Sequence, residues 1–403
     1  MLFEPFTFSN GTIAKNRFFK SAMEEQLAQD SQPTQALVNL YRTWAEGGAG
    51  VLMTGNVMVS ERGKGSINDV VVADERSLPM LKAWADAGKT DHTLMLMQIN
   101  HAGKQSPKAV NREPVAPSAV PLVGMDGFIL PPRELTAAEI QQIIAEFVQT
   151  AKIAEKAGFS GVQIHAAHGY LISQFLSPHH NRREDEWGGN LDNRMNFLLK
   201  IYQGIRENVG SGFLVGVKLN SADFQKGGFD EQESIEVVKK LSEMGIDFIE
   251  ISGGNYESPA MLAEKASTRQ REAFFLDYAE KARKISQVPL IITGGFRSET
   301  AMNEALTSGA VDLVGVARPF ALIPDLPNKI QNGSYETLTT SRIKTGFAPL
   351  DKKVGAVLEM EWYMAQMRLI GEGKSPNPQL PAWKVLWHTI VSNGKAGLST
   401  VRS

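Results

Sequence analysis

Short apolar runs rich in branched residues recur along the chain, and longer stretches with the helical period lie between them. The strand-like runs cover residues 17–22, 50–54, 93–99, 161–164, 213–219, 248–251, 290–293 and 313–316. The helix-like stretches include residues 137–157, 192–209, 231–244, 273–285 and 298–308. Apolar strands that alternate with amphipathic helices are typical of a parallel sheet covered on both faces. Eight such units predict a closed (β/α)8 TIM barrel rather than an open, doubly wound sheet.

The chain is longer than a bare barrel. A (β/α)8 barrel needs roughly 250 residues, whereas this chain has 403. Residues 104–133 are rich in Pro, Gly and Val and lack a helical period, which predicts a hairpin-bearing insertion after the third strand, over the barrel mouth. We expect a barrel domain over residues 1–345 and a C-terminal extension, residues 346–403, that packs on the barrel or on a neighbouring subunit.

The extension contains a Met-rich helical run at residues 358–373 that includes Trp362 and Tyr363. Aromatic and methionine side chains are enriched at protein interfaces. We therefore predict a homo-oligomer that uses this segment, with packing in the core as the alternative role of the two aromatic residues.

Charge and composition narrow the range of partners. The chain has 42 basic and 44 acidic residues, and no basic run points to a nucleic acid or an anionic membrane. No stretch approaches the ~18 apolar residues of a membrane span, and the first ten residues lack the basic flank of a signal peptide. The absence of cysteine excludes disulfides and cysteine-ligated clusters. We expect a cytoplasmic enzyme that binds a small molecule.

The richest chemistry follows the fourth strand, in the sequence HAAHGY. His165, His168 and Tyr170 lie there, and barrel enzymes keep their catalytic groups at the carboxyl ends of the strands. A histidine pair can ligate zinc, but a zinc site needs a third protein ligand, and His101 is the only other histidine at a strand end. We therefore predict no metal. The alternative role of Tyr170 is packing within the loop.

The loop that continues from this block carries further polar residues. Arg183 and Asp185 are expected to pin the loop rather than to touch a substrate, and His179 and His180 are expected to be solvated.

The last two strands end in small residues. Gly294 and Gly295 follow the seventh strand, and Ala317 and Arg318 follow the eighth. Barrels frequently bind phosphate with these two loops and a helix N-terminus. An anion site is the prediction, and a simple strand-to-helix turn is the alternative.

Several strand ends together resemble one known family. The segments KSAMEE, TGNV, QINHAGKQ, HAAHGY, VKLN, GGFR and VARPF are similar, strand by strand, to the signature of the old yellow enzymes, which are FMN-dependent ene reductases. The resemblance spans about residues 3–320.

The resemblance implies a set of cofactor contacts. One set of residues would lie along the flavin ring, a second set would bind its pyrimidine part, and a third set would hold the phosphate. Lys218 would place positive charge near N1 and C2=O, where relatives frequently carry arginine, and Glu24 stands where many relatives carry cysteine or threonine. The implied FMN ligands are Ser21, Ala22, Met23 and Glu24 along the ring, Asn56, Gln98 and Lys218 at the pyrimidine, and Gly294, Gly295, Ala317 and Arg318 at the phosphate.

The resemblance also implies a reaction. NADH or NADPH would reduce the flavin, which would pass a hydride from N5 to an activated alkene such as an enone. His165 and His168 would donate hydrogen bonds to the substrate carbonyl, and Tyr170 would protonate the neighbouring carbon. Gln26 would line the substrate pocket, where some relatives carry tyrosine.

Other functions compete with this one. An FMN oxidase or dehydrogenase acting on an amine or a saturated ketone is the first alternative. A non-enzymatic flavin-binding barrel and a metal-dependent barrel lyase are the others.

Overall fold

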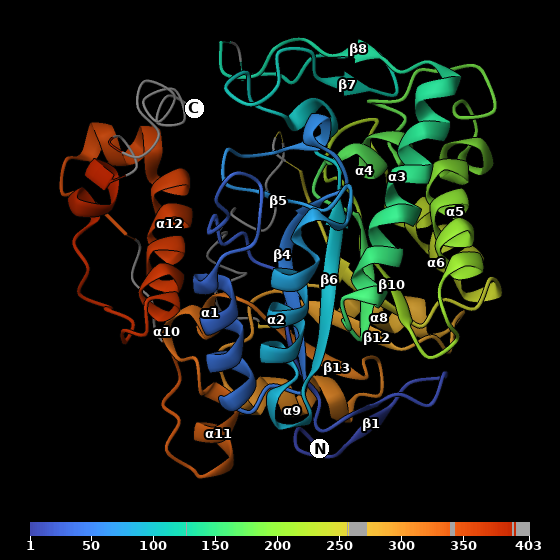
Figure 1. The fold of residues 1–403 in the computed structure, drawn as a ribbon. Helices are drawn as coiled ribbons and strands as arrows, with labels where there is room; N and C mark the ends of the chain where they lie inside the picture. The colour runs from blue at the N-terminus through green and yellow to red at the C-terminus, as the bar shows by residue number, and fades with distance from the viewer. Residues whose placement is uncertain (126, 256, 258–271, 339–342, 389–390, 392–403) are drawn as a thin grey trace.

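Eight parallel strands close into a barrel in the computed structural model (Figure 1). The structure describes residues 1–125, 127–255, 257, 272–338, 343–388 and 391. Each barrel strand pairs with the next in parallel, and pairing between the first two strands, Phe19 with Val51, completes the ring. The barrel strands are β3 (Phe18–Lys20), β4 (Val51–Met58), β6 (Leu94–Asn100), β9 (Gly161–Ala166), β10 (Leu214–Asn220), β11 (Phe248–Ser252), β12 (Leu290–Thr293) and β13 (Leu313–Val316). The predicted (β/α)8 barrel is confirmed.

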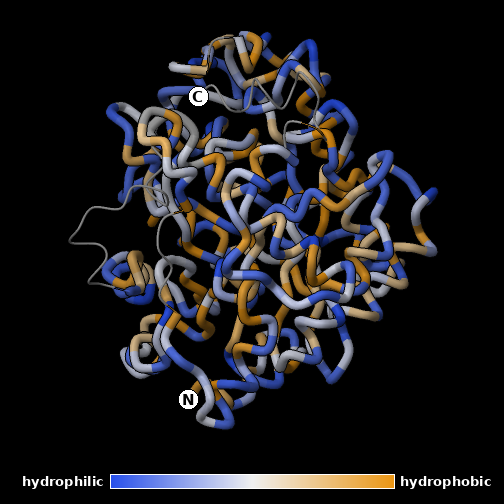
Figure 2. The backbone as a smooth tube through the Cα atoms, turned by 90° about the vertical axis from the view of Figure 1, so that its left-hand side faces the viewer, coloured by the Kyte–Doolittle hydropathy of each residue, from blue (hydrophilic) through white to orange (hydrophobic). Residues whose placement is uncertain are grey.

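Helices surround the barrel. They are α1 (Gln35–Glu46), α2 (Leu78–Gly88), α3 (Ala137–Lys156), α4 (Leu171–Leu176), α5 (Leu191–Asn208), α6 (Glu231–Glu243), α8 (Leu276–Arg283), α9 (Glu299–Thr307), α10 (Arg318–Leu322), α11 (Leu326–Gln331) and α12 (Ala348–Gly371). Five of them, α3, α5, α6, α8 and α9, lie close to the predicted bounds, whereas α12 begins ten residues before the predicted run at residues 358–373. Apolar stretches run through the middle of the molecule (Figure 2). Among the described residues, no helix combines the length and the hydropathy that crossing a membrane requires.

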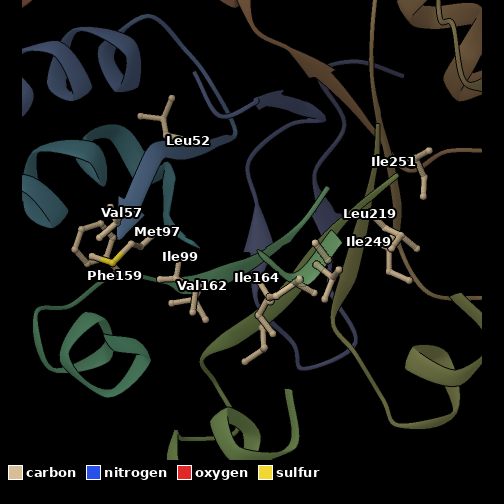
Figure 3. Packing of buried hydrophobic residues seen from close by; sticks show 14 of the residues in the cluster. Leu52, Val57, Met97, Ile99, Phe159, Val162, Ile164, Leu219, Ile249 and Ile251 are labelled. Carbon is tan, nitrogen blue, oxygen red and sulfur yellow. The ribbon is translucent and has the colours of Figure 1, made fainter. Parts of the chain in front are cut away.

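The strands are apolar on both faces in their lower halves. Outward side chains such as Val162, Ile164 and Ile249 pack beneath the helices (Figure 3). Inward side chains such as Phe19, Leu214 and Phe248 form a second cluster inside the barrel. Because side chains alternate along a strand, this second cluster closes the bottom of the barrel and leaves only the upper inward positions for polar groups.

The insertion after β6 differs from its prediction. Its two short strands, β7 (Val115–Ala116) and β8 (Arg133–Glu134), pair in parallel, and the one antiparallel bridge in its described part joins Pro107 to Ile129. The expected hairpin is therefore wrong, although the insertion does lie over one end of the barrel (Figure 1).

Arg183 ties the insertion to the loop after α4. Its guanidinium donates to the carbonyl oxygens of Leu135, at 2.7 Å, and Pro117, at 3.0 Å, and it pairs with Asp185. The predicted pinning role of Arg183 and Asp185 is confirmed.

The extension begins with α12, which packs beside α1 and α10 (Figure 1). Trp362 and Tyr363 are buried against the protein's own core, and the Trp362 indole donates to the Leu380 carbonyl at 2.9 Å. Their role within one chain is therefore core packing. The exposed aromatic residues of the described extension are Phe347, Trp383 and Trp387.

Candidate functional site

Polar side chains replace apolar ones at the upper inward positions of the strands. The register pairs Gln98 with Gln163 and Lys218 with both His165 and Glu250. Each of these side chains is buried. Buried polar groups require hydrogen-bond partners, so this layer of polar side chains must bond internally, bind a ligand, or do both. The hydrogen bonds within the layer show which of its donors and acceptors remain for a ligand.

Glu250 lies at the centre of this layer. Its Oε1 atom lies 3.1 Å from the Lys218 ammonium and accepts a hydrogen bond from the Thr293 hydroxyl at 2.6 Å. Its Oε2 atom accepts from Gln163 Nε2 at 2.7 Å, and Gln163 Oε1 accepts from Gln98 Nε2 at 2.7 Å. Five strands, β6, β9, β10, β11 and β12, are thus linked in one network centred on the Glu250 carboxylate.

The network extends to β3 through a hydroxyl pair. Ser21 Oγ lies 2.6 Å from Thr293 Oγ1. A Cβ atom at Gly315 would lie 1.9 Å from that Thr293 oxygen, so only glycine leaves room for the pair. Two predicted flavin ligands are therefore held by this network: Ser21 through Thr293 and Lys218 through Glu250, and Thr293 and Glu250 bond to each other.

His165 and Tyr170 face each other at the end of β9. Their ring centroids lie 4.9 Å apart, and both side chains are buried. His165 Nδ1 accepts a hydrogen bond from the Ala167 backbone N–H at 3.3 Å. Burial, with the nearby His168 and Lys218, lowers the pKa of His165 well below its usual value. The ring is therefore neutral at pH 7 with its proton on Nε2, and that N–H is a donor.

His168 lies next to this pair, 5.1 Å from the His165 centroid. Its φ of +60° is a left-handed conformation that is uncommon outside glycine, and its backbone N–H donates to Asn220 Oδ1 at 3.2 Å. Its Nε2 atom lies 2.7 Å from Ser252 Oγ. Burial, and secondarily Lys218, lowers the pKa of His168 to about 3, so this ring is also neutral.

Asn56 connects the second strand to the same group. Its Nδ2 atom lies 3.4 Å from the Tyr170 hydroxyl, and its Oδ1 atom accepts from Asn100 at 3.2 Å. Asn56 also lines a cavity of about 10 Å³ together with Glu24, Gln26 and Asp69. Burial, reinforced by Asp69, raises the pKa of Glu24 to about 8.

The predicted phosphate end holds anions of the chain itself. The Glu272 carboxylate accepts from the backbone N–H groups of Arg297 and Ser298 at 2.6 and 2.9 Å, beside the left-handed Gly295. Arg318 pairs with Glu359 of α12 at 3.0 Å. The backbone N–H groups of Arg297 and Ser298 and the Arg318 guanidinium each bind a carboxylate, so these donors also suit a phosphate. A phosphate bound there would have to displace Glu272 and Glu359.

Gly55 sets how closely the first two strand ends approach. Its N–H donates to Glu25 Oε1 at 2.8 Å, and Tyr41 donates to the same carboxylate. A Cβ atom at Gly55 would lie 2.0 Å from Glu25 Oε2 and 2.3 Å from the Met23 carbonyl oxygen. The segment that carries Met23 and Glu24 therefore depends on this glycine.

Gly55→Ala should lower the free energy of unfolding by about 1–3 kcal/mol, the cost of overpacking a tight interior. Urea denaturation followed by circular dichroism measures it. Gly212→Ala is the matched control, because a Cβ atom there meets nothing within 4 Å. Equal stabilities of the two variants would contradict the close approach.

A second polar group lies beside the site. His179, His180 and Glu257 place possible metal ligand atoms within 4.8 Å of one another. His180 is buried rather than solvated, because its Nδ1 atom lies 2.8 Å from the buried Lys104 ammonium, so the prediction for His180 is wrong. Glu257 accepts from Val123 N and Gln225 Nε2 at 2.8 and 2.5 Å. His180 Nδ1 and both Glu257 oxygens, which could ligate a metal, are therefore already hydrogen-bonded. Through Lys104 and Val123 these bonds join the insertion to the barrel.

Three of the groups that build this site were missed from the sequence: Gln163, Glu250 and Thr293. Thr293 ends β12 opposite Gly315 and directly precedes the predicted ligand Gly294. Gln163 and Glu250 are polar residues inside otherwise apolar strands, in register with the predicted flavin ligands Gln98 and Lys218. That register was the available signal.

Comparisons with known proteins agree with this geometry. Residues 1–337 match the model of the NADH:flavin oxidoreductase / NADH oxidase family. The NADH-dependent flavin oxidoreductase iliE of Hypocrea jecorina (strain QM6a) is 39% identical over 354 residues, which cover 81% of this chain and 88% of that protein. The NADPH dehydrogenase of Geobacillus sp. (strain WCH70) is 32% identical, with 81% and 92% covered. The solved old yellow enzyme homologue from Zymomonas mobilis superposes with a TM-score of 0.72 at 26% identity, covering 84% of this chain and 94% of that one.

The family match over most of the chain agrees with the barrel fold and with the similarity to the solved old yellow enzyme homologue. The chain belongs to the NADH:flavin oxidoreductase / NADH oxidase family and is an FMN-dependent oxidoreductase that takes its electrons from a reduced nicotinamide.

Proposed function

We propose that this enzyme reduces the C=C bond of α,β-unsaturated carbonyl compounds. The observation that supports the proposal most is the grouping of two neutral histidines and one tyrosine at the mouth, with His165 4.9 Å from Tyr170 and 5.1 Å from His168. Neutral N–H donors stabilise negative charge that develops on a carbonyl oxygen, and a phenol can supply the proton that completes the reduction.

Each member of this group has one task in the proposal. His165 donates from Nε2 to the substrate carbonyl, because its Nδ1 atom is occupied by the Ala167 N–H. His168 donates from Nδ1 if the Ser252 hydroxyl donates to its Nε2. Tyr170 protonates the carbon next to the carbonyl, and Asn56 orients its hydroxyl. FMN, when bound, supplies the hydride.

The cofactor contacts form the second part of the proposal. The polar layer around Glu250 would bind the pyrimidine, and the loops after β12 and β13 would bind the phosphate. Gln26, which lines the small cavity beside Glu24 and Asn56, would contact the substrate. The proposed FMN ligands are Ser21, Ala22, Met23, Glu24, Asn56, Gln98, Lys218, Gly294, Gly295, Ala317 and Arg318.

Anaerobic turnover tests the activity. Beyond the one equivalent that reduces the flavin, NADH should be consumed only when cyclohexenone is present, and cyclohexanone should form in equal amount to the NADH consumed. Oxidation of an amine or a saturated ketone with reduction of the flavin, in the absence of alkene reduction, would favour the dehydrogenase alternative instead.

We also propose that residues 346–403 form a C-terminal extension that packs on the barrel or on a neighbouring subunit, and that the protein is a homo-oligomer. Trp383 and Trp387 are 59% and 66% exposed within one chain, an unusual position for such large apolar side chains. A cytoplasmic location stays a prediction from the sequence.

The oligomer can be tested by mass in solution. Trp387→Ser should lower the mass towards that of a monomer, because it removes apolar area from the contact. Trp362→Phe changes only a side chain that is buried within one chain and should leave the mass unchanged. An oligomer that is insensitive to Trp387→Ser would argue against this surface.

A further inference from the structure

We propose that Glu250 is a positioning residue for the side chains of the polar layer that would contact FMN. It offsets the charge of Lys218 and fixes the direction in which the amides of Gln163 and Gln98 point. Glu250 would thereby lower the reduction potential of bound FMN and strengthen FMN binding. The inference rests on FMN as the cofactor and is independent of alkene reduction.

The charge argument begins with burial. Glu250 has 0% of its surface exposed, and the Lys218 side chain is 4% exposed. Water therefore screens their interaction poorly. Lysine next to the flavin N1 region favours the reduced, negatively charged cofactor. A carboxylate 3.1 Å from the same ammonium opposes that effect, so the pair as a whole stabilises reduced FMN less than Lys218 alone would.

Glu250 is ionised despite its burial. Burial raises the pKa of Glu250, but Lys218 and the hydrogen bonds from Thr293 and Gln163 lower it by more. The net shift of the pKa is therefore downward. An ionised carboxylate only accepts hydrogen bonds. All of its near neighbours in the layer are donors, which is the arrangement that a buried charge requires.

The direction argument follows from the same fact. Because Glu250 only accepts, Gln163 must turn its Nε2 atom towards Glu250 and its Oε1 atom towards Gln98. Gln98 must then donate to Gln163 with one of its N–H groups. The Gln98 carbonyl oxygen and second N–H remain for the flavin pyrimidine, which presents an N–H between two carbonyl groups. The negative charge of Glu250 on β11 thus determines which hydrogen-bonding groups Gln98 on β6 presents to the flavin. Two strands, β10 and β9, lie between β11 and β6.

Glu250→Gln tests both arguments with little change of shape. Loss of the negative charge should move the equilibrium towards reduced FMN by about tenfold, which is ~30 mV upward for a two-electron couple. The new amide can also turn its N–H towards Gln163 and reverse the chain, so FMN should bind several-fold more weakly. Dye-coupled anaerobic reduction measures the potential, and fluorescence quenching on the apoprotein measures FMN binding.

Two further variants separate charge from structure. Asp247→Asn removes another buried carboxylate next to the same strand, one that pairs with Arg206 at 3.1 Å and faces away from the layer; it should leave the potential unchanged. In a Lys218→Met background, Glu250→Gln should shift the potential less than in the parent, because the cation that Glu250 offsets is gone.

Specific results would overturn the inference. A potential that is unchanged or lowered in FMN-loaded Glu250→Gln would exclude the charge role, and unchanged FMN affinity would exclude the direction role. If Glu250→Gln does not retain FMN, Glu250→Asp decides, because it keeps the charge: a potential close to that of the parent supports the inference, and a tenfold shift in the equilibrium contradicts it. Failure of the parent to reduce any alkene would leave all of these results intact.

Discussion

Tyr170→Phe should slow reoxidation of the NADH-reduced enzyme by cyclohexenone about 10²- to 10⁴-fold, the range of a lost general acid. The hydroxyl is the only group removed, and it lies 3.4 Å from Asn56 Nδ2 beside the His165 ring. Reduction of the flavin by NADH requires no proton from Tyr170 and should be largely unchanged. Stopped-flow absorbance under anaerobic conditions measures the two half-reactions separately.

Tyr202→Phe is the matched control for this variant. Its hydroxyl donates to the Met244 carbonyl at 3.2 Å, and Tyr202 lies on α5, outside the barrel. It should leave both half-reactions unchanged. If Tyr170→Phe slowed both half-reactions equally, Tyr170 would not be the proton donor.

His165→Ala should slow the same oxidative half-reaction by about 10²- to 10³-fold, or roughly 2.7–4 kcal/mol of transition-state stabilisation, by analogy with the loss of one oxyanion donor. The proton of His165 is fixed on Nε2 by the Ala167 N–H, so alanine removes an oriented donor. Single-turnover reoxidation at saturating enone measures the loss.

The control for His165 is His179→Ala, a histidine of the neighbouring loop with a half-buried side chain that lies 3.9 Å from Glu257. It should affect reoxidation little. Comparable losses in the two histidine variants would indicate general disturbance of the mouth rather than loss of a donor.

The barrel could be predicted from the sequence because its strands are apolar on both faces. Residues such as Val162 and Ile164 pack outward while Leu214 and Phe248 fill the interior, which leaves continuous apolar runs that differ clearly from the amphipathic helices. Strand ends were harder to predict: β4 continues to Met58, four residues beyond the predicted run, because Val57 and Met58 pair with β5 (Val70–Val71) on one side and with β6 on the other.

The site was predictable in part. His165, His168 and Tyr170 stand together in the sequence and also in space. Glu250 and Thr293 lie on separate strands, and only the barrel register brings them to Lys218 and Ser21. A reading that treats each strand as a plain apolar run overlooks such positions.

Contacts between distant loops could not be predicted. His180 is buried because Lys104, 76 residues earlier in the chain, reaches its ring. The insertion's strands β7 and β8 pair in parallel across a long loop, and short segments with proline carry little information about pairing direction.

The central claim is that a reduced flavin in this site passes its electrons to an activated alkene. The most direct test follows the visible flavin absorbance of the FMN-loaded protein under anaerobic conditions, first with one equivalent of NADH and then with cyclohexenone. We expect the absorbance to bleach with NADH and to return fully with the enone, with cyclohexanone as the product. Bleaching by NADH without any return in the presence of cyclohexenone, maleimide or other activated alkenes would contradict the proposed function.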